Sequence, residues 1–303
     1  MKKITMKDVA KEADVSIATV SYVLNENKNE TIPEETRRKV IAAAKKLNYV
    51  PNLAARSLVK RKSNLIGILI VKDYENRIPW RRSYYSEFID LLVEKLNRLG
   101  YHVLISNIDK NNPELEIILS RELDGVFLID VNKEIFYNIS NKFEVPIIII
   151  DSFINDEYFQ KVIPDFEDAI YKSIETNIGT ETILLLDKFN DDEINQRLIN
   201  VFKERFSKIY IADNYDSLVK YLNENKDFSF VVLGELLCSI ASKYIESRKL
   251  TAICTCDNSY LLDDEIKKVI VSSKTKSDIA VKIMMDYIDG KYYDEKIVLI
   301  KAD

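Results

Sequence analysis

The hydrophobic pattern changes character near residue 64 of the 303-residue chain. Beyond that point, short and nearly continuous apolar runs alternate with segments that repeat apolar residues at helical spacing. Strands that are apolar throughout and separated by helices are typical of parallel sheets covered on both faces. Because about 240 residues are many for one such sheet, we predict two doubly wound lobes with a cleft between them. The apolar runs lie at 65–71, 101–107, 124–130, 145–151, 182–187, 208–213 and 228–234.

The first 50 residues carry helical periodicity instead. Thr5 and Asp8 have the spacing of a capping box at the start of a helix to about residue 13, and Ser16 can cap a second helix to about residue 25. A third helix is predicted from Pro33 to about residue 47. Its inward residues are expected to be Val40, Ile41, Ala44 and Leu47. Three short helices, the first two joined by a tight turn, are typical of a helix-turn-helix head.

Residues 50–62 separate these two regions. Pro51 interrupts the helical pattern, and the segment 53–58 favours a helix but is too short to be stable alone. We therefore predict a DNA-binding head at 1–49, a hinge at 50–62 and a two-lobed sensing and dimerisation domain at 63–303.

Charge is divided in the same way. Residues 1–62 hold 14 Lys and Arg against seven Asp and Glu, a net +7, whereas the remainder holds 30 basic and 42 acidic residues, a net −12. A small basic head on an acidic body suggests that only the head contacts a polyanion. Chance clustering of solvated charges is the alternative that charge alone leaves open.

Several classes of protein are disfavoured. No apolar run reaches the ~18 residues of a membrane helix, and the charged N-terminus lacks the apolar core of a secretory signal. The three cysteines fit a reducing cytoplasm, so we expect a cytoplasmic protein without membrane contact. We find no motif for a cofactor, and Cys254 and Cys256 have no histidine nearby for zinc, so we interpret them as core thiols. His102 lies on a predicted strand and is interpreted as structural, which argues against an enzyme.

Residues 4–67 also carry an ordered set of motifs: DVAKEADVS at 8–16, SIATVSYVLN at 16–25, NYVPNLAARSL at 48–58 and IGILI at 66–70. In this order and spacing the chain resembles the LacI/GalR (lactose-repressor) family. The resemblance implies an all-α helix-turn-helix head and an α/β, two-lobed, doubly wound sensor domain like a periplasmic binding protein. It also implies a homodimeric, DNA-binding transcriptional regulator, a repressor of a carbohydrate-uptake or catabolic operon, bound to near-palindromic double-stranded operator DNA.

The family places a recognition helix, here Ser16 to Asn25, in the major groove. Ile17 or Ala18 can meet a thymine methyl group, and Thr19 and Ser21 can bond to bases or phosphates, although Thr19 could instead pack the head. Tyr22 replaces a common arginine and cannot make a bidentate contact to guanine. The implied DNA contacts of the head are Thr5, Ser16, Ile17, Ala18, Thr19, Ser21, Tyr22 and Asn25.

The family's hinge folds into a helix on DNA beside the hinge of the second subunit. The residues that this implies as contacts are Asn52, Ala55, Arg56 and Leu58. Leu58 would wedge into a central base step of the minor groove, at a cost in base unstacking that a bent duplex recovers. The alternative is that Leu58 is an ordinary core residue.

The family's cleft binds a small-molecule effector, usually a sugar or sugar phosphate. An Arg/Asp pair could hold a polar ligand bidentately, and two tyrosines could stack on a ring. Each residue could instead serve as a structural ion pair, a strand-end cap or helix packing. The positions that match are Tyr84, Tyr85, Asp165, Arg197 and Asp257.

Other positions depart from the family pattern. Asn200 replaces a glycine, and Gly234–Glu235 replaces an Asn–Asp pair that commonly touches ligand. The segment 76–83 combines Trp80 with three arginines and is interpreted either as a clamp for an anionic ligand or acidic partner or as an exposed loop. A ligand-independent or protein-partner-controlled regulator with a degenerate cleft therefore remains open. A sugar-binding module or an enzyme would have no use for the basic head.

Overall fold

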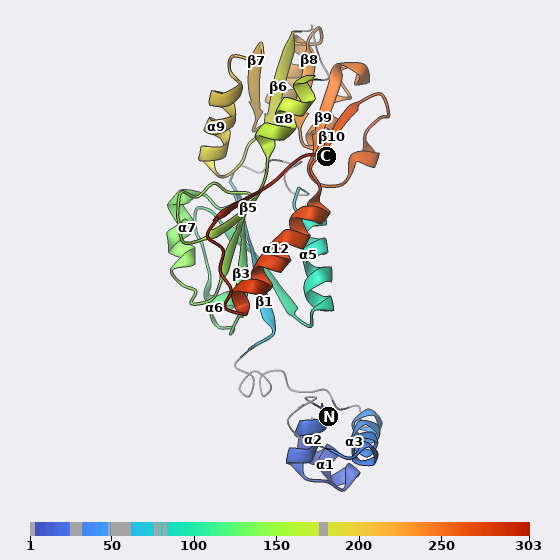
Figure 1. Ribbon diagram of the computed structural model, residues 1–303. Coiled ribbons are helices and arrows are strands. Elements are labelled where there is room, and N and C mark those ends of the chain that lie inside the picture. The colour runs from blue at the N-terminus through green and yellow to red at the C-terminus, as the bar shows by residue number, and fades with distance from the viewer. Residues whose placement is uncertain are drawn as a thin grey trace. The chain divides into compact units, whose positions relative to one another are not determined.

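The computed structural model describes residues 4–24, 32–47, 49, 62–75, 78, 80, 84–175 and 181–303. Contacts divide the chain into two units, Met1–Ser63 and Asn64–Asp303, which we call the head and the body (Figure 1). The predicted hinge at 50–62 lies almost entirely outside the described residues, which include only position 62 of it.

The head contains the three predicted helices, α1 (Met6–Ala13), α2 (Ile17–Leu24) and α3 (Glu34–Lys46). The Thr5 backbone N–H and hydroxyl both donate to Asp8 Oδ2, at 2.8 and 2.6 Å, so the predicted cap is formed. Helix α1 ends at Asp14, whose φ of 53° turns the chain toward α2. The buried apolar residues of the head are Val9, Ala10, Ala13, Val20, Val23, Val40 and Ala43.

One inward position of α3 was wrong. Ala43 is buried, whereas Ile41 is 41% exposed. The buried stripe follows Val40 and Ala43 at a spacing of three, and at about 100° per residue Ile41 points away from it.

The body contains two sheets in which every strand pairing is parallel, which confirms the predicted α/β fold class. The first lobe has strand order β11-β5-β4-β3-β1-β2 and the second β10-β9-β8-β6-β7. The first-lobe strands are β1 (Leu65–Lys72), β2 (His102–Asp109), β3 (Gly125–Ile129), β4 (Ile147–Ile150), β5 (Gln160–Pro164) and β11 (Ile297–Ile300). The second-lobe strands are β6 (Thr182–Asp187), β7 (Lys208–Ala212), β8 (Ser229–Leu233), β9 (Leu250–Cys254) and β10 (Lys267–Ile270).

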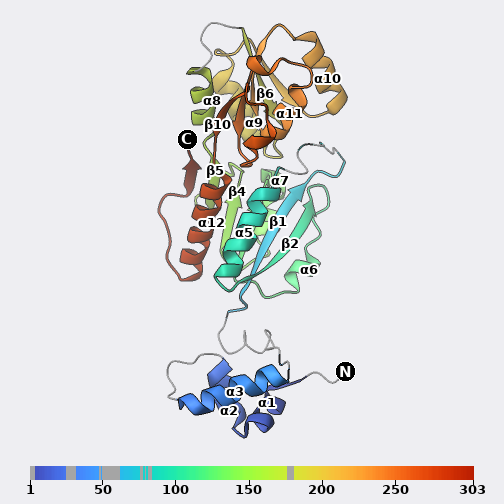
Figure 2. The ribbon, with the colours of Figure 1, turned by 90° about the vertical axis from the view of Figure 1, so that its right-hand side faces the viewer.

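Helices flank both sheets (Figure 2). Those of the first lobe are α5 (Ser86–Arg98), α6 (Glu116–Leu119), α7 (Lys133–Ser140) and α12 (Ser273–Ile288). Those of the second are α8 (Phe166–Glu175), α9 (Asp192–Phe202), α10 (Tyr215–Glu224) and α11 (Glu235–Ala241), with 3-10 turns at Ser247–Lys249 and Ser259–Leu261. Helix α6 has only four residues.

The chain passes between the lobes after β5, after β10 and after β11. Backbone hydrogen bonds connect these crossing segments to one another. The N–H of Asp165 donates to Ile300 O at 2.7 Å, and the N–H of Asp303 donates to Ile270 O at 2.8 Å. Asp168 adds its carboxylate, which accepts the N–H of Ala302 at 3.0 Å. The lobes are therefore connected by several adjacent segments, an arrangement that suits hinge motion about the crossings.

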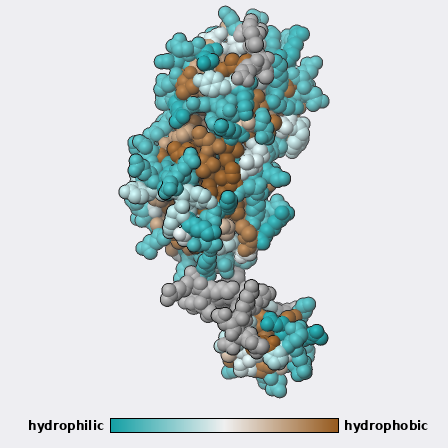
Figure 3. All heavy atoms as spheres, viewed as in Figure 1, coloured by the Kyte–Doolittle hydropathy of each residue, from teal (hydrophilic) through white to brown (hydrophobic). Residues whose placement is uncertain are grey.

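Strand β11 forms one open edge of the first sheet. It exposes Ile297 and Leu299, which are 36% and 40% accessible, and Figure 3 shows apolar surface on this side of the body. The strand has only four residues and lies between Lys296 and Lys301. Short edge strands flanked by lysine resist pairing with other chains.

Candidate DNA-binding surface and effector cleft

Helix α2 presents a small outward face. Ser16 Oγ accepts the N–H of Thr19 at 3.0 Å and lies 2.9 Å from Thr19 Oγ1, so Ser16 caps the helix as predicted. Ile17 is 49% exposed and Ala18 is also exposed. Val20 and Val23 are buried and fix the opposite face against α1 and α3. An exposed apolar residue at the start of a capped helix is suited to contact with base edges in a groove.

The other predicted DNA contacts fall into two groups. Thr19, Ser21 and Tyr22 are half-buried along α2, and Thr5 is exposed beside α1 with its hydroxyl bonded to Asp8. The remaining predicted contacts lie outside the described residues; they are Asn25, Asn52, Ala55, Arg56 and Leu58.

The body contains a cavity of about 890 Å³ among its described residues. It lies where β1, β2 and β3 of the first lobe and β6 and β7 of the second lobe end, the side of parallel sheets at which ligands usually bind. Its polar lining includes Lys72, Asp73, Glu75, Asn107, Lys110, Asp130, Asn132, Glu134, Lys188, Asn190, Asp192, Asp213 and Asn214.

The lining is strongly polar. Lys110 and Asp73 form an ion pair at 3.0 Å, and the buried Oδ1 of Asn132 accepts no hydrogen bond from the described residues. Carboxylates, amides and ammonium groups that converge on one cavity suit a ligand with many hydroxyl groups. Tyr85 and Phe189 add aromatic surface.

Of the five predicted effector residues, only Tyr85 lines this cavity. Asp165 and Arg197 instead lie at a second cavity of about 20 Å³, with room for roughly one water molecule. Asp165 Oδ1 accepts the N–H of Asp168 at 3.1 Å and caps α8. Arg197 pairs with Glu167 and lies over the ring of Phe153, 4.8 Å from its centroid.

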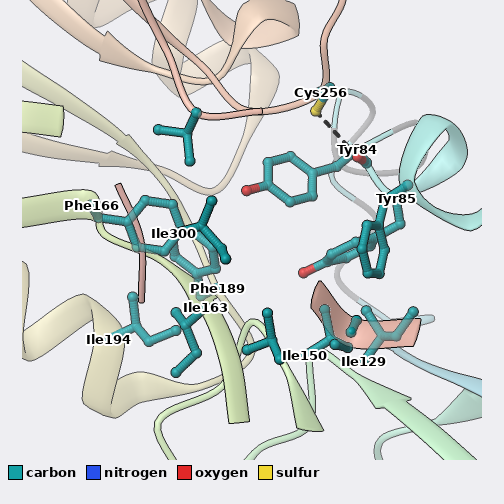
Figure 4. Packing of buried hydrophobic residues seen from close by; sticks show 14 of the residues in the cluster. Tyr84, Tyr85, Ile129, Ile150, Ile163, Phe166, Phe189, Ile194, Cys256 and Ile300 are labelled. Atoms are coloured by element: carbon teal, nitrogen blue, oxygen red, sulfur yellow. Dashed lines mark hydrogen bonds between the residues drawn. The ribbon is translucent and has the colours of Figure 1, made fainter. Parts of the chain in front are cut away.

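The two other predicted effector residues also have structural contacts. Tyr84 is only 6% exposed and packs edge-on against Phe189, with ring centroids 6.4 Å apart (Figure 4). Asp257 accepts the backbone N–H of Lys274, the second residue of α12, at 2.9 Å. These four residues therefore do not line the 890 Å³ cavity, because each is used at a helix start or in packing, and their role as effector contacts stays a prediction.

The side chain of Trp80 is buried and does not face the surface. It is 5% exposed, and its Nε1–H donates to Asp187 Oδ1 at 2.9 Å. The arginines beside it, at 77, 81 and 82, lie outside the described residues. A buried indole needs such a hydrogen-bond acceptor, and Asp187 at the end of β6 supplies it.

Glu235 also turns away from the cavity. Its carboxylate accepts the backbone N–H of Thr255 at 3.0 Å, of Cys256 at 2.8 Å and of Asn258 at 3.3 Å. It therefore holds the loop that follows β9. Burial also raises the pKa of Cys256, and that of Cys238 to about 12, so both thiols stay protonated and unreactive while buried. This agrees with the interpretation of core thiols.

Sequence patterns did not indicate the buried ion pair of Lys276 with Asp151. Lys276 Nζ lies 3.1 and 2.9 Å from the two carboxylate oxygens, and the side chains are 3% and 0% exposed. Lys276 also lies over the ring of Phe88 at 4.4 Å. Asp151 follows β4 and Lys276 lies in α12, so the pair joins strand β4 to helix α12.

A model of the "Bacterial regulatory proteins, lacI family" matches residues 5–52. The chain is 40% identical over 172 residues to catabolite control protein A of Staphylococcus xylosus, which covers 55% of this chain and 49% of the relative. It is 37% identical over 256 residues to catabolite control protein A of Staphylococcus aureus N315, covering 82% and 69%. The chain thus spans about half the length of the first relative and about two thirds of the second.

Solved structures share the fold. The lac repressor dimer bound to operator and the anti-inducer ONPF has a TM-score of 0.79 at 18% identity, covering 100% of this chain and 97% of that one. The transcriptional regulator CelR–cellobiose complex has a TM-score of 0.61 at 17% identity, covering 99% and 98%.

The ion pair of Lys276 and Asp151 gives a test of the body's architecture. K276M should lower the free energy of unfolding by about 3–5 kcal/mol, because it leaves a buried carboxylate without its partner. The double variant D151N/K276M should be more stable than K276M, since asparagine removes the charge and tolerates the φ of 55° at position 151. Urea unfolding measures both, and equal stability of the two variants would contradict the pairing.

Proposed function

The chain belongs to the lacI family of bacterial regulatory proteins, and we propose that it is a sequence-specific DNA-binding transcriptional regulator of the cytoplasm that represses a carbohydrate-uptake or catabolic operon. The observation that carries this proposal is the capped helix α2, which exposes Ile17 and Ala18 from a basic head. Membership of a family of regulators also supports the expectation that the protein is not an enzyme. Within the described residues, no helix has the length and apolar character needed to cross a bilayer.

We propose that Ile17 and Ala18 contact base edges, with Thr19, Ser21 and Tyr22 at bases or phosphates. The basic head would supply the salt-sensitive part of the affinity through phosphate contacts. A homodimer would place two α2 helices on the halves of a near-palindromic operator. The lac repressor structure, a dimer on its operator, supports this arrangement for a chain of the same fold.

A small-molecule effector is the second part of the proposal. The 890 Å³ cavity and its polar lining favour a sugar or sugar phosphate, and CelR binds cellobiose. Tyr85 is the predicted effector residue that we retain for this site. The alternative is a regulator whose degenerate cleft needs no ligand, and the structural contacts of Tyr84, Asp165, Arg197 and Asp257 favour that alternative.

Ile17 and Ile41 provide a matched pair for testing the DNA surface, because both are exposed isoleucines of the head, at 49% and 41%. I17A should raise the Kd for a duplex selected by the wild-type protein from a random pool by about five- to thirtyfold, the loss of about 1–2 kcal/mol of apolar contact. I41A on α3 should leave the Kd unchanged. Fluorescence anisotropy measures both Kd values. Equal effects of the two substitutions would mean that α2 is not part of the DNA interface.

Leu58 tests the proposed hinge contact. L58A should lower affinity for the same duplex by about tenfold or more, because the minor-groove wedge is lost. Light scattering should show the same oligomeric state for L58A and wild type, since Leu58 would act only on DNA. An unchanged Kd would assign Leu58 to packing instead.

The cavity can be tested with a panel of sugars and sugar phosphates. A ligand at about 100 times its Kd should stabilise the protein by about 2.7 kcal/mol and raise Tm by roughly 5–10 °C for a chain of this size. N132A should reduce this shift, because it removes an amide that lines the cavity. A panel without any shift in Tm would favour the degenerate-cleft alternative.

A further inference from the structure

We infer that the body holds its two lobes closed with its own side chains and needs no ligand to do so. The contacts responsible come from two loops, which we call the latch: Trp80 of the first lobe, and Asn190 and Asp191 of the second. Each bonds to the opposite lobe. Because the latch concerns the body alone, it goes beyond the proposed function and does not depend on DNA binding.

Trp80 belongs to the first lobe by sequence, since it lies between β1 and α5. Its side chain nevertheless packs in the apolar cluster of the second lobe, together with Ile78, and the two are 5% and 9% exposed. The Nε1–H bond to Asp187 anchors the indole at the end of β6. Withdrawing Trp80 would expose a large aromatic surface and remove a donor from a buried carboxylate, both of which oppose opening.

Asn190 makes the matching contacts in the other direction. From the loop after β6, its Nδ2 lies 3.2 Å from Val71 O, 3.2 Å from Asp130 O and 3.1 Å from Asp130 Oδ2. Its backbone N–H donates to Asp130 Oδ1 at 3.2 Å. Val71 and Asp130 lie at the ends of β1 and β3, so one side chain of the second lobe joins two strands of the first.

Asp191 extends the junction along the same loop. Its Oδ2 accepts the backbone N–H of Phe153 in the first lobe at 2.5 Å, while Oδ1 accepts the N–H of Glu193 and caps α9. Cys256 of the second lobe donates its thiol to Tyr84 O of the first at 3.2 Å. Figure 4 shows the apolar side chains of both lobes that surround this contact.

These contacts are intramolecular, so they do not depend on the concentration of any ligand. A ligand changes a conformational equilibrium only by its difference in affinity for the two states. When the protein's own groups already stabilise the closed state, a ligand has little closure left to produce. Asn190, Asp130 and Phe189 also line the 890 Å³ cavity, so a ligand there would act on the latch itself.

The alkylation rate of the Cys256 thiol measures lobe opening. It is 2% exposed at the junction, whereas Cys238 is 0% exposed in the core of the second lobe. Pulsed alkylation with iodoacetamide at pH 8, without DNA or ligand, followed by mass-spectrometric localisation of the label, gives the rate at each thiol. When reclosing is faster than alkylation, the rate is proportional to the population of the open state.

In the wild-type protein, Cys256 should react orders of magnitude more slowly than an unfolded peptide. N190A should increase the alkylation rate of Cys256 by about ten- to a hundredfold, because hydrogen bonds to a charged group are lost. The alkylation rate of Cys238 should not change. W80F retains most of the apolar volume but loses the bond to Asp187. It should also increase the alkylation rate of Cys256 and leave that of Cys238 unchanged.

The matched control is N225A. Asn225 is a buried asparagine, 6% exposed, whose side chain bonds, among the described residues, to Tyr221 and Lys208 of the second lobe. N225A should not increase the alkylation rate of Cys256 relative to that of Cys238. Rapid alkylation of Cys256 in the wild type would mean that the lobes stand open, and equal acceleration of both thiols in N190A and W80F would mean general destabilisation. Either result, or no change in Cys256 in both variants, overturns the latch.

Discussion

The two sheets of the body share one apolar cluster, which continues from the first lobe through the junction into the second. Polar groups at the adjoining strand ends are consequently removed from water and need partners within the protein. Four aspartates meet this condition: Asp130 bonds to Asn190, Asp151 to Lys276, Asp187 to Trp80, and Asp191 to the N–H of Phe153. Asp130, Asp187 and Asp191 join the two lobes, whereas Asp151 joins β4 to α12 within the first lobe.

The use of these carboxylates is consistent with their electrostatics. Burial raises the pKa of Asp191, although the N–H groups of Phe153 and Glu193 oppose that shift. Backbone donors thus make the buried charge tolerable without a counter-ion. Lys276 serves Asp151 in a different way, by supplying the opposite charge directly. The junction therefore uses backbone, amide and indole donors to stabilise its carboxylates, and an ammonium group does the same for Asp151 within the first lobe.

Local signals predicted the head well. The caps at Thr5 and Ser16 involve residues three apart, so sequence spacing alone specifies them. The apolar runs of β1 to β4 and of β6 to β8 were equally visible, because buried parallel strands are apolar on both faces. The strands β5 and β11 were less visible, since they are short, contain or adjoin lysine, and depend on pairing across more than 130 residues.

The junction could not be predicted, because its contacts are long-range. Trp80 and Asp187 are 107 residues apart, and Asn190 and Asp130 are 60 apart. Nothing near Trp80 in the sequence indicates that its ring enters the opposite lobe. Family resemblance also did not indicate the contacts of Asp165, Arg197 and Asp257, because matching residue types do not fix side-chain partners. The first turn of α8 supplies the N–H of Asp168 to Asp165, and the first turn of α12 supplies the N–H of Lys274 to Asp257.

The polar nature of the junction bears on how such a body could still respond to a signal. An apolar contact between lobes is lost entirely on opening, whereas a hydrogen bond is exchanged for one to water and contributes only about 0.5–1.5 kcal/mol net. Asn190 and Asp130 lie at the wall of the cavity, where ligand hydroxyl groups can replace their mutual bonds at small cost. Allosteric coupling energies of about 1–3 kcal/mol are of the same size. A closed body with inter-lobe hydrogen bonds beside a cavity is therefore stable by itself and can still respond to a ligand. A wholly apolar junction would be stable but would not respond to a ligand.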